Sequence, residues 1–326
     1  MARCGRTERL RRWVSERVTG RYRVAAVDCG TNSTRLLITD PDGSTRTRLM
    51  RITRLGEGVD ATGVLAQAAI DRTIDALREF RHEIDCACVG RTRLVATSAA
   101  RDAQNSASFL DAASSTIGAP AEILDGQSEG ELATAGATRG LEAHAGDDIV
   151  LDIGGGSTEL AVQRNGAVTA TSLDIGCVRV SERFLRGDPP RGPELQQAAS
   201  YVTSVVSGSL ASLWGADGPR PDSRLIGLAG SVTTLAALEL GLEEYDPVHT
   251  HHSVLTRDAV NHWCTLLGAA TASERAAMPG IPRGREDVIV GGALILRIVM
   301  DLLGAQDCLV SETDLLDGLA MSMLDA

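Results

Sequence analysis

The sequence predicts an α/β protein made of two domains that share one topology and face each other. Its 326 residues are enough for two domains with buried cores. Short apolar strand patterns alternate with helical patterns along the chain, which is typical of α/β proteins. One pattern, D-x-G-x-x-S-T-x-L, occurs at Asp28 and again at Asp152 without a gap. The offset of 152 − 28 = 124 residues is far too long for a solenoid repeat and suits two related domains.

Each copy of this pattern lies in the same succession of elements. The first reads Val-Asp-Cys-Gly-Thr-Asn-Ser-Thr-Arg-Leu and the second reads Leu-Asp-Ile-Gly-Gly-Gly-Ser-Thr-Glu-Leu. An apolar run precedes each aspartate, at 24–27 and 149–151, and another follows, at 36–38 and 160–162. Turn signals come next, at 40–43 and 165–166. The sequence therefore predicts strand, glycine hairpin, strand, turn and strand, twice.

The remaining elements continue the alternation. Apolar residues at three- and four-residue steps predict a helix over 66–83. After Gly126, the pair Ser128 and Glu131 is typical of a capping box, so a helix over 128–139 is expected to bridge the two halves. Residues 287–303 are apolar almost all round and predict a buried helix. Further strands are expected at 92–96, 121–124, 225–228 and 308–310, and further helices near Ser98, at 178–185 and 194–213, from Ala229, and at 313–323.

These elements divide the chain into three parts. Residues 1–21 form a basic extension, 22–127 the first domain and 128–326 the second, with the last helix, about 313–325, expected to pack back on the first domain. The first 23 residues hold eight arginines and two glutamates, a local charge of 8 − 2 = +6. Two hypotheses remain open for this extension: a loosely held tail, or a tether for a polyanionic substrate.

Composition excludes several classes of protein. The formal net charge of −11 argues against a protein that coats nucleic acid. The sequence has no apolar run of about 18 residues, so no membrane span is predicted. The arginine-rich start lacks the apolar segment of a secretory signal. Seven scattered cysteines do not form a disulfide framework, so reduced thiols and a cytoplasmic location are expected.

The chain contains no lysine. This excludes a P-loop lysine, a Schiff-base lysine and a lysine general base. Any side-chain cation that clamps phosphate must therefore be an arginine, which binds such oxygens in a bidentate manner.

The two glycine hairpins are suited to binding phosphate. Main-chain N–H groups in such turns can converge on an anion because no Cβ blocks the approach. The candidate donors are Gly30, Thr31, Asn32 and Ser33 in the first copy and Gly154, Gly155, Gly156 and Ser157 in the second. Asp28 and Asp152 would repel phosphate, so we expect them to hold Mg²⁺ or another divalent cation, or to orient water. A single such motif is more often an ordinary turn; two aligned copies favour a site.

Several segments together resemble one known family. They are Asp28-Cys-Gly-Thr-Asn-Ser33, Ala96-Thr-Ser-Ala-Ala-Arg-Asp102, Asp125-Gly-Gln-Ser-Glu129, Asp152-Ile-Gly-Gly-Gly-Ser157 and Gly227-Leu-Ala-Gly-Ser231. In this order they resemble the exopolyphosphatase and guanosine pentaphosphate phosphatase (Ppx/GppA) family. The resemblance implies two ribonuclease H-like domains of the actin, sugar-kinase and heat-shock-chaperone superfamily facing a central cleft. It also implies the short two-domain form, without the additional C-terminal region of longer relatives, and a homodimer.

The resemblance also assigns roles to individual residues. Glu129 matches the catalytic glutamate; on its position alone it would be a carboxylate favoured at a helix N-terminus. Arg101 matches an arginine that contacts phosphate, and Arg179 lies in a segment that resembles part of the family's cleft; the alternative for Arg101 is a solvated surface residue. Glu159 matches an acidic residue near the metal, or is an outward strand residue. Gly230 and Ser231 match a nucleoside-contacting motif of the kinase relatives, or an inherited turn.

The function implied is Mg²⁺-assisted hydrolysis of the terminal phosphate of inorganic polyphosphate, with Glu129 as the general base for water. The closest alternative is removal of the 5′-γ-phosphate of guanosine pentaphosphate, which would link the protein to the stringent response. An ATP-dependent sugar or acid kinase and a non-enzymatic actin-like module are more distant alternatives. Neither nucleic acid nor a membrane is expected as a partner.

Overall fold

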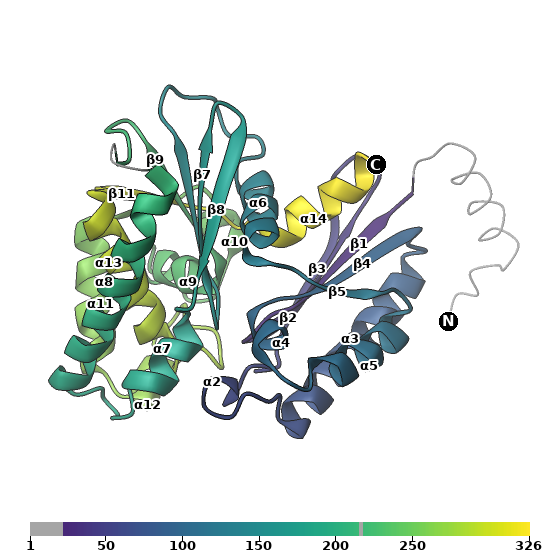
Figure 1. The fold of residues 1–326 in the computed structure, drawn as a ribbon, viewed down its shortest axis with the longest axis horizontal. Coiled ribbons are helices and arrows are strands. Elements are labelled where there is room, and N and C mark those ends of the chain that lie inside the picture. The colour runs from purple at the N-terminus through teal and green to yellow at the C-terminus, as the bar shows by residue number, and fades with distance from the viewer. Residues whose placement is uncertain (1–21, 215–217) are drawn as a thin grey trace, which may run out of the picture.

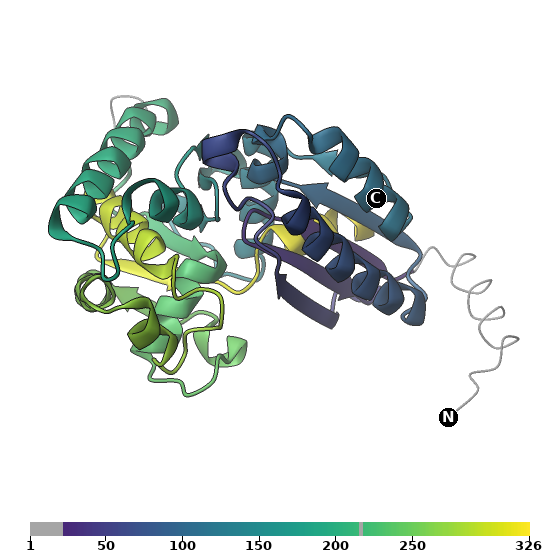
Figure 2. The same cartoon turned by 90° about the horizontal axis from the view of Figure 1, so that it is seen from below.

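Two mixed β-sheets organise the fold in the computed structural model, which describes residues 22–214 and 218–326. Figures 1 and 2 show the two sheets in two lobes, each with its own helices. The basic extension predicted at 1–21, and with it the tether hypothesis, lies outside the described residues.

The two sheets repeat one strand order. In the first, β1 (Val24–Cys29), β2 (Ser33–Thr39) and β3 (Thr45–Ile52) are antiparallel neighbours, and β4 (Arg91–Ala96) and β5 (Ala121–Ile123) continue parallel to β1, in the order β3-β2-β1-β4-β5. In the second, β6 (Asp148–Ile153), β7 (Thr158–Arg164), β8 (Ala167–Leu173), β9 (Arg224–Leu228) and β11 (Asp307–Val310) give β8-β7-β6-β9-β11. An antiparallel strand, β10 (Val254–Thr256), is added at the edge. The repeated topology confirms the predicted α/β class and duplicated architecture.

Each sheet buries both faces, and β1 shows how. Its residues alternate between faces: Ala25 and Val27 pack into one hydrophobic cluster, and Val24 and Ala26 pack into another. The first cluster is built with α3 (Gln67–Cys86) and α5 (Ser106–Ile117). The short helices α2 (Val59–Thr62) and α4 (Ser98–Asp102) complete this lobe.

The second sheet is covered on one face by the longer helices of its lobe. They are α7 (Cys177–Phe184), α8 (Gly192–Trp214), α9 (Ala229–Glu239), α11 (Arg257–Ala269) and α13 (Ile289–Leu303), with the short α10 (Pro247–Thr250) and α12 (Ala272–Ala276) beside them. Helix α13 is buried along most of its length, as its apolar sequence predicts.

Two helices, α6 (Gly126–Ala137) and α14 (Leu315–Leu324), lie between the sheets (Figure 1). Small residues allow this close packing: an added Cβ on Gly136 would lie 2.0 Å from the Asp314 carbonyl oxygen, and one on Gly318 would lie 2.0 Å from that of Leu132. Helix α14 packs in one cluster with the β1 residues Val24 and Ala26, so the end of the chain contacts the first sheet.

Most predicted elements are confirmed to within a few residues, but the predicted capping box is wrong. Helix α6 begins at Gly126, and its N-cap is Asp125, whose side chain accepts a hydrogen bond from the Ser128 N–H at 2.8 Å. Glu131 instead accepts a hydrogen bond from Gln127 on the same helix. Both Asp and Ser can cap a helix, and the aspartate at the end of the preceding loop takes this position.

Helices α2, α5, α10, α11 and α12 and strand β10 were not predicted from the sequence. Among the described residues, six cysteines are free thiols and four of these are buried. Within the same residues, no helix combines the length and apolar character needed to cross a bilayer.

Candidate active site

The two glycine hairpins meet across the boundary between the lobes. A Cβ added to Gly155 would lie 2.9 Å from the Thr31 Cβ and 3.1 Å from the Asn32 nitrogen. One added to Gly156 would lie 2.8 Å from the Thr31 hydroxyl and 2.6 Å from the hydroxyl of Ser98. Glycine is therefore required here for close packing as well as for the turn.

A cavity of about 440 Å³ opens beside the hairpins. It brings together most of the predicted site residues, namely Asp28, Gly30, Thr31, Asn32, Ser33, Glu129, Asp152, Gly154, Gly155, Gly156 and Ser157. Three other predicted residues, Arg101, Glu159 and Arg179, are not among its lining residues. Backbone N–H groups from two domains thus border one space that is also lined by five carboxylates, those named above and Glu312 and Asp314, an arrangement suited to a phosphate chain and a cation.

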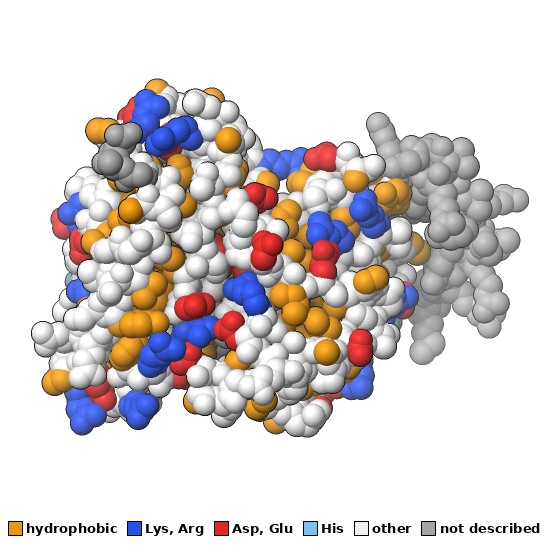
Figure 3. All heavy atoms as spheres, viewed as in Figure 1, with side chains coloured by type: hydrophobic (Ala, Val, Ile, Leu, Met, Phe, Trp, Pro, Cys, Tyr) orange, Lys and Arg blue, Asp and Glu red, His pale blue; other side chains and the backbone are white. Residues whose placement is uncertain are grey.

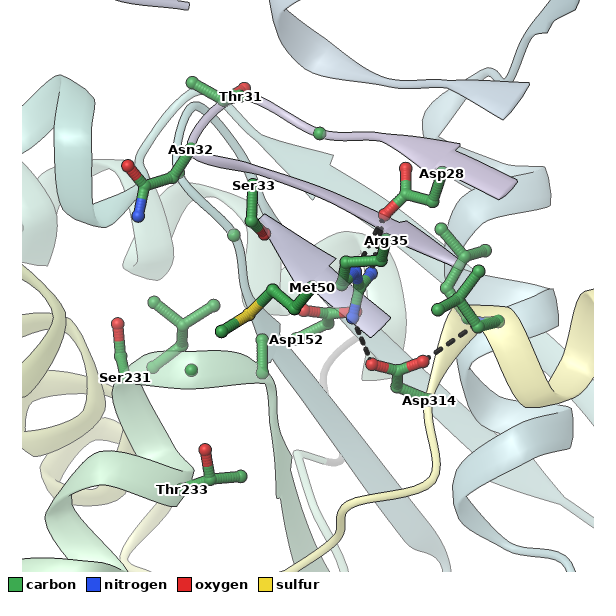
Figure 4. Close-up of a pocket in the computed structure, with 18 of the residues that line it drawn as sticks. Asp28, Thr31, Asn32, Ser33, Arg35, Met50, Asp152, Ser231, Thr233 and Asp314 are labelled. Carbon is green, nitrogen blue, oxygen red and sulfur yellow. Dashed lines mark hydrogen bonds and ion pairs between the residues drawn. The ribbon is translucent and has the colours of Figure 1, made fainter. Parts of the chain in front are cut away.

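Asp28 stands at the end of β1 and is paired with Arg35 in the hairpin register. Its Oδ2 accepts hydrogen bonds from Nε and Nη2 of Arg35, at 3.0 and 2.7 Å. The other oxygen, Oδ1, is buried and has no hydrogen-bond partner among the described residues. Figure 4 shows it pointing away from Arg35. Burial raises the pKa of Asp28, and Arg35 opposes this effect.

Asp152 is the equivalent residue of the second hairpin, directly across from Glu159 of β7. Burial, with the added repulsion of Glu159, raises the pKa of Asp152 to about 8. Glu159 is buried, and its Oε1 accepts a hydrogen bond from the Ser172 hydroxyl at 2.7 Å. Glu159 does not line the cavity, so direct contact with a metal remains a prediction.

Glu129 lies in the first turn of α6, with only 6% of its surface exposed. An added Cβ on Gly126 would lie 2.2 Å from the Ser172 Cβ, so the glycine lets this end of α6 lie against β8. Burial raises the pKa of Glu129 well above its usual value, and neighbouring carboxylates raise it further. A carboxylate of high proton affinity at a cavity wall is suited to accept a proton from water.

Arg101 of α4 contacts Glu129 instead of lining the cavity. Its Nη1 donates to Oε2 of Glu129 at 3.3 Å and to the Leu124 carbonyl at 2.9 Å. Its positive charge lowers the pKa of Glu129 and so opposes the effect of burial. Arg101 of the first domain therefore contacts Glu129, the candidate general base, at the start of the second domain.

Arg179 of α7 is bound to two acids of the first domain and to a carbonyl of its own domain. Its Nη1 donates to Asp60 at 2.7 Å, its Nη2 pairs with Asp102, and its Nε donates to the Gly156 carbonyl at 2.7 Å. Arg183 pairs with Asp60 as well. Charged side chains gather on the surface where α7 meets α2 (Figure 3). To bind phosphate, Arg179 would have to exchange these partners, so that role remains a prediction.

Other cavity residues were missed at the level of sequence: Arg35, Arg48, Tyr245, Arg285, Glu312 and Asp314. Arg35 could have been found, because hairpin pairing places it opposite Asp28. Arg285 and Asp314 carry no such local signal. Gly230 and Ser231, which resemble the nucleoside motif, also line this cavity, and the Arg285 guanidinium packs so closely on Gly230 that a side chain there would displace it.

The carboxylates of the cavity suit a divalent cation that shares its coordination shell with substrate and water. The described residues contain no cluster of three or more His, Cys, Asp or Glu side chains that could hold a metal. Mg²⁺, however, is usually bound through one or two carboxylates, with substrate phosphate oxygens and water completing the shell. Asp28, with its unpaired Oδ1, and Asp152 fit that pattern.

Comparisons with known proteins agree with one another. A model of the Ppx/GppA phosphatase family matches residues 42–326. Exopolyphosphatase 2 of Mycobacterium tuberculosis is 39% identical over 318 residues, which is 92% of this chain and 98% of that protein. The crystal structure of an exopolyphosphatase-like protein is 33% identical, with a TM-score of 0.87 and coverage of 93% of this chain and 99% of the other. An Aquifex aeolicus Ppx/GppA family member is 32% identical, with a TM-score of 0.77 and coverage of 93% and 98%.

Proposed function

This chain belongs to the Ppx/GppA phosphatase family, and we propose that it is an exopolyphosphatase, a phosphoanhydride hydrolase that releases terminal phosphate from inorganic polyphosphate. The observation that carries the proposal is the meeting of two glycine hairpins at a cavity that also contains the buried carboxylate of Glu129. A cytoplasmic location and a homodimer remain predictions.

The residues divide the work of hydrolysis as follows. The terminal phosphoryl group lies in the cavity beside the hairpins, where main-chain N–H groups of both hairpins donate hydrogen bonds to its oxygens. Glu129 orients a water molecule and accepts its proton as the water oxygen bonds to phosphorus. The bond from phosphorus to the bridging oxygen breaks, and the shortened polyphosphate leaves with that oxygen. Arg101 holds the Glu129 carboxylate and adds positive charge beside the phosphoryl group.

Asp28 and Asp152 are the residues that would hold Mg²⁺. When bound, the ion supplies neutralisation of charge on the phosphate oxygens. The two aspartates otherwise repel the substrate, so hydrolysis should depend on an added divalent cation. Chelation with EDTA is expected to abolish phosphate release.

The decisive experiment measures phosphate release by the purified chain, with Mg²⁺, from polyphosphate and from guanosine pentaphosphate. A higher kcat/KM on polyphosphate supports the proposal. A higher kcat/KM on guanosine pentaphosphate would assign the chain to the other activity of the family. Release from neither substrate, or ADP formation from ATP with a sugar or acid acceptor, would overturn it.

A further inference from the structure

Asp314 connects the C-terminal helix to the cavity. It is the N-cap of α14: its Oδ1 accepts a hydrogen bond from the Leu316 N–H at 2.9 Å. Its Oδ2 forms an ion pair with Nη1 of Arg35, which belongs to the first sheet. Asp314 is only 5% exposed and lines the cavity. One carboxylate therefore joins the start of α14 to a side chain 279 residues earlier.

Arg35 passes this connection on to Asp28. The N–H groups on two edges of its guanidinium are divided between the two acids: Nη1 pairs with Asp314, and Nε and Nη2 bind a single oxygen of Asp28. Figure 4 shows the three side chains in a row, with Asp152 close by. Because Arg35 binds only Oδ2, the buried Oδ1 of Asp28 accepts no hydrogen bond from the described residues and can coordinate a cation.

The charge of Arg35 has a second consequence. An arginine guanidinium stays charged in proteins, so Arg35 is a cation in direct contact with Asp28. A cation held at Asp28 would experience repulsion from this guanidinium. Asp314 supplies the negative charge that offsets it, in addition to the charge of Asp28 itself.

We propose that Asp314 is a positioning residue: acting through Arg35, it fixes Asp28 with Oδ1 available to a divalent cation and offsets the arginine charge. Cation binding is thereby made dependent on the docking of α14 against the first sheet. The inference rests on the proposed role of Asp28 as a cation ligand. It concerns a residue beyond those assigned to hydrolysis above.

The test is the binding of Mg²⁺ to the full chain without substrate, measured by isothermal titration calorimetry. Asp314→Asn keeps an oxygen for the Leu316 N–H, and asparagine caps helices as well as aspartate does, but the charge is lost. We expect Mg²⁺ affinity to fall by about tenfold or more, the range seen when groups that orient metal ligands are removed. If this variant fails to fold, Asp314→Ser, which also caps a helix, replaces it.

The matched control is Ser322→Ala on the same helix. Ser322 accepts a hydrogen bond from Nη1 of Arg93 at 3.0 Å and lies outside the cavity. Its loss weakens a contact of α14 with the first sheet without changing the charge near Arg35. Unchanged Mg²⁺ affinity in this variant is expected.

A double-mutant cycle with Arg35→Gln separates positioning from a general structural effect. If Asp314 acts through Arg35, Asp314→Asn changes Mg²⁺ affinity by less than twofold in the Arg35→Gln background. Three results would each overturn the inference. The double variant could lose Mg²⁺ affinity by the product of the two single losses, Asp314→Asn could bind Mg²⁺ within twofold of the wild type, or the wild type could bind no divalent cation. Because these measurements contain no substrate, they remain valid if hydrolysis of both phosphate substrates fails.

Discussion

Nη1 of Arg101 lies 3.3 Å from Oε2 of Glu129, so α4 of the first lobe contacts the start of α6 at the cavity. The arginine opposes the burial that raises the pKa of this carboxylate. The pair thus holds a strongly basic carboxylate in place at the boundary where the two hairpins meet.

Glu129→Gln should lose most of the activity. We expect kcat to fall by about 10²- to 10⁴-fold, the usual contribution of a general base, with little change in KM. Initial rates of phosphate release measure both. Glu131→Gln is the matched control, because Glu131 is an exposed residue of the same helix that contacts Gln127. Wild-type activity in Glu129→Gln would remove the proposed role.

The pH dependence of kcat/KM should reflect the raised pKa of Glu129. A base must be ionised to accept a proton, so activity should fall on acidification at a pH well above the ordinary glutamate range. Arg101→Met removes the opposing charge and should move this fall to still higher pH. Profiles measured from pH 5 to 9 on both proteins provide the comparison; coinciding profiles would contradict the coupling of the pair.

Asp152→Asn should stabilise the protein at alkaline pH. The folded-state pKa of Asp152 is raised from 3.8 to about 8, so its contribution to stability is complete below pH 4 and is lost as pH rises towards 8. The asparagine does not titrate. In EDTA we expect equal melting temperatures near pH 4 and a Tm that is higher by at least several degrees for the variant at pH 8.5. A Tm difference independent of pH would refute this account.

Gly156→Ala should separate the hairpins. The new Cβ would lie 2.6 Å from the Ser98 hydroxyl and 2.8 Å from that of Thr31, so the side chains that hold the two hairpins together here must shift. A displacement of about 1 Å can cost roughly 100-fold in kcat/KM. Gly208→Ala in α8 is the control, since nothing lies within 4 Å of its added Cβ. Equal activity of both variants would show that hairpin contact is not required.

Two roles for Arg179 predict different results. If Arg179 links the lobes, it acts through Asp60 and Asp102. Arg179→Met should then reduce kcat/KM about tenfold in the wild type but have little effect when both acids are replaced by asparagine. We expect this result because its donors are already bound. If Arg179 instead binds phosphate, Arg179→Met should raise the KM for polyphosphate in that background by as much as it does in the wild type.

The sequence predicted the parts of the site that depend on local backbone. The paired D-x-G-x-x-S-T patterns specify strand, tight turn and strand, and both hairpins have this form at Gly30 and Gly154. The cap of α6 was misassigned because Asp125 and Ser128 can both cap a helix, and local pattern alone does not rank them. The choice of Glu129 as the base came from the family resemblance.

The amino-acid sequence by itself determined the α/β class, the duplication and the two anion-binding turns, because each depends on residues close together in the chain. Tertiary structure alone decided that Thr31 meets Gly156, that Arg179 is bound to the acids of the other lobe, and that Asp314 reaches Arg35. These contacts arise when α6 and α14 pack between the sheets on their glycine faces. No local pattern records a pairing that depends on how separate elements pack.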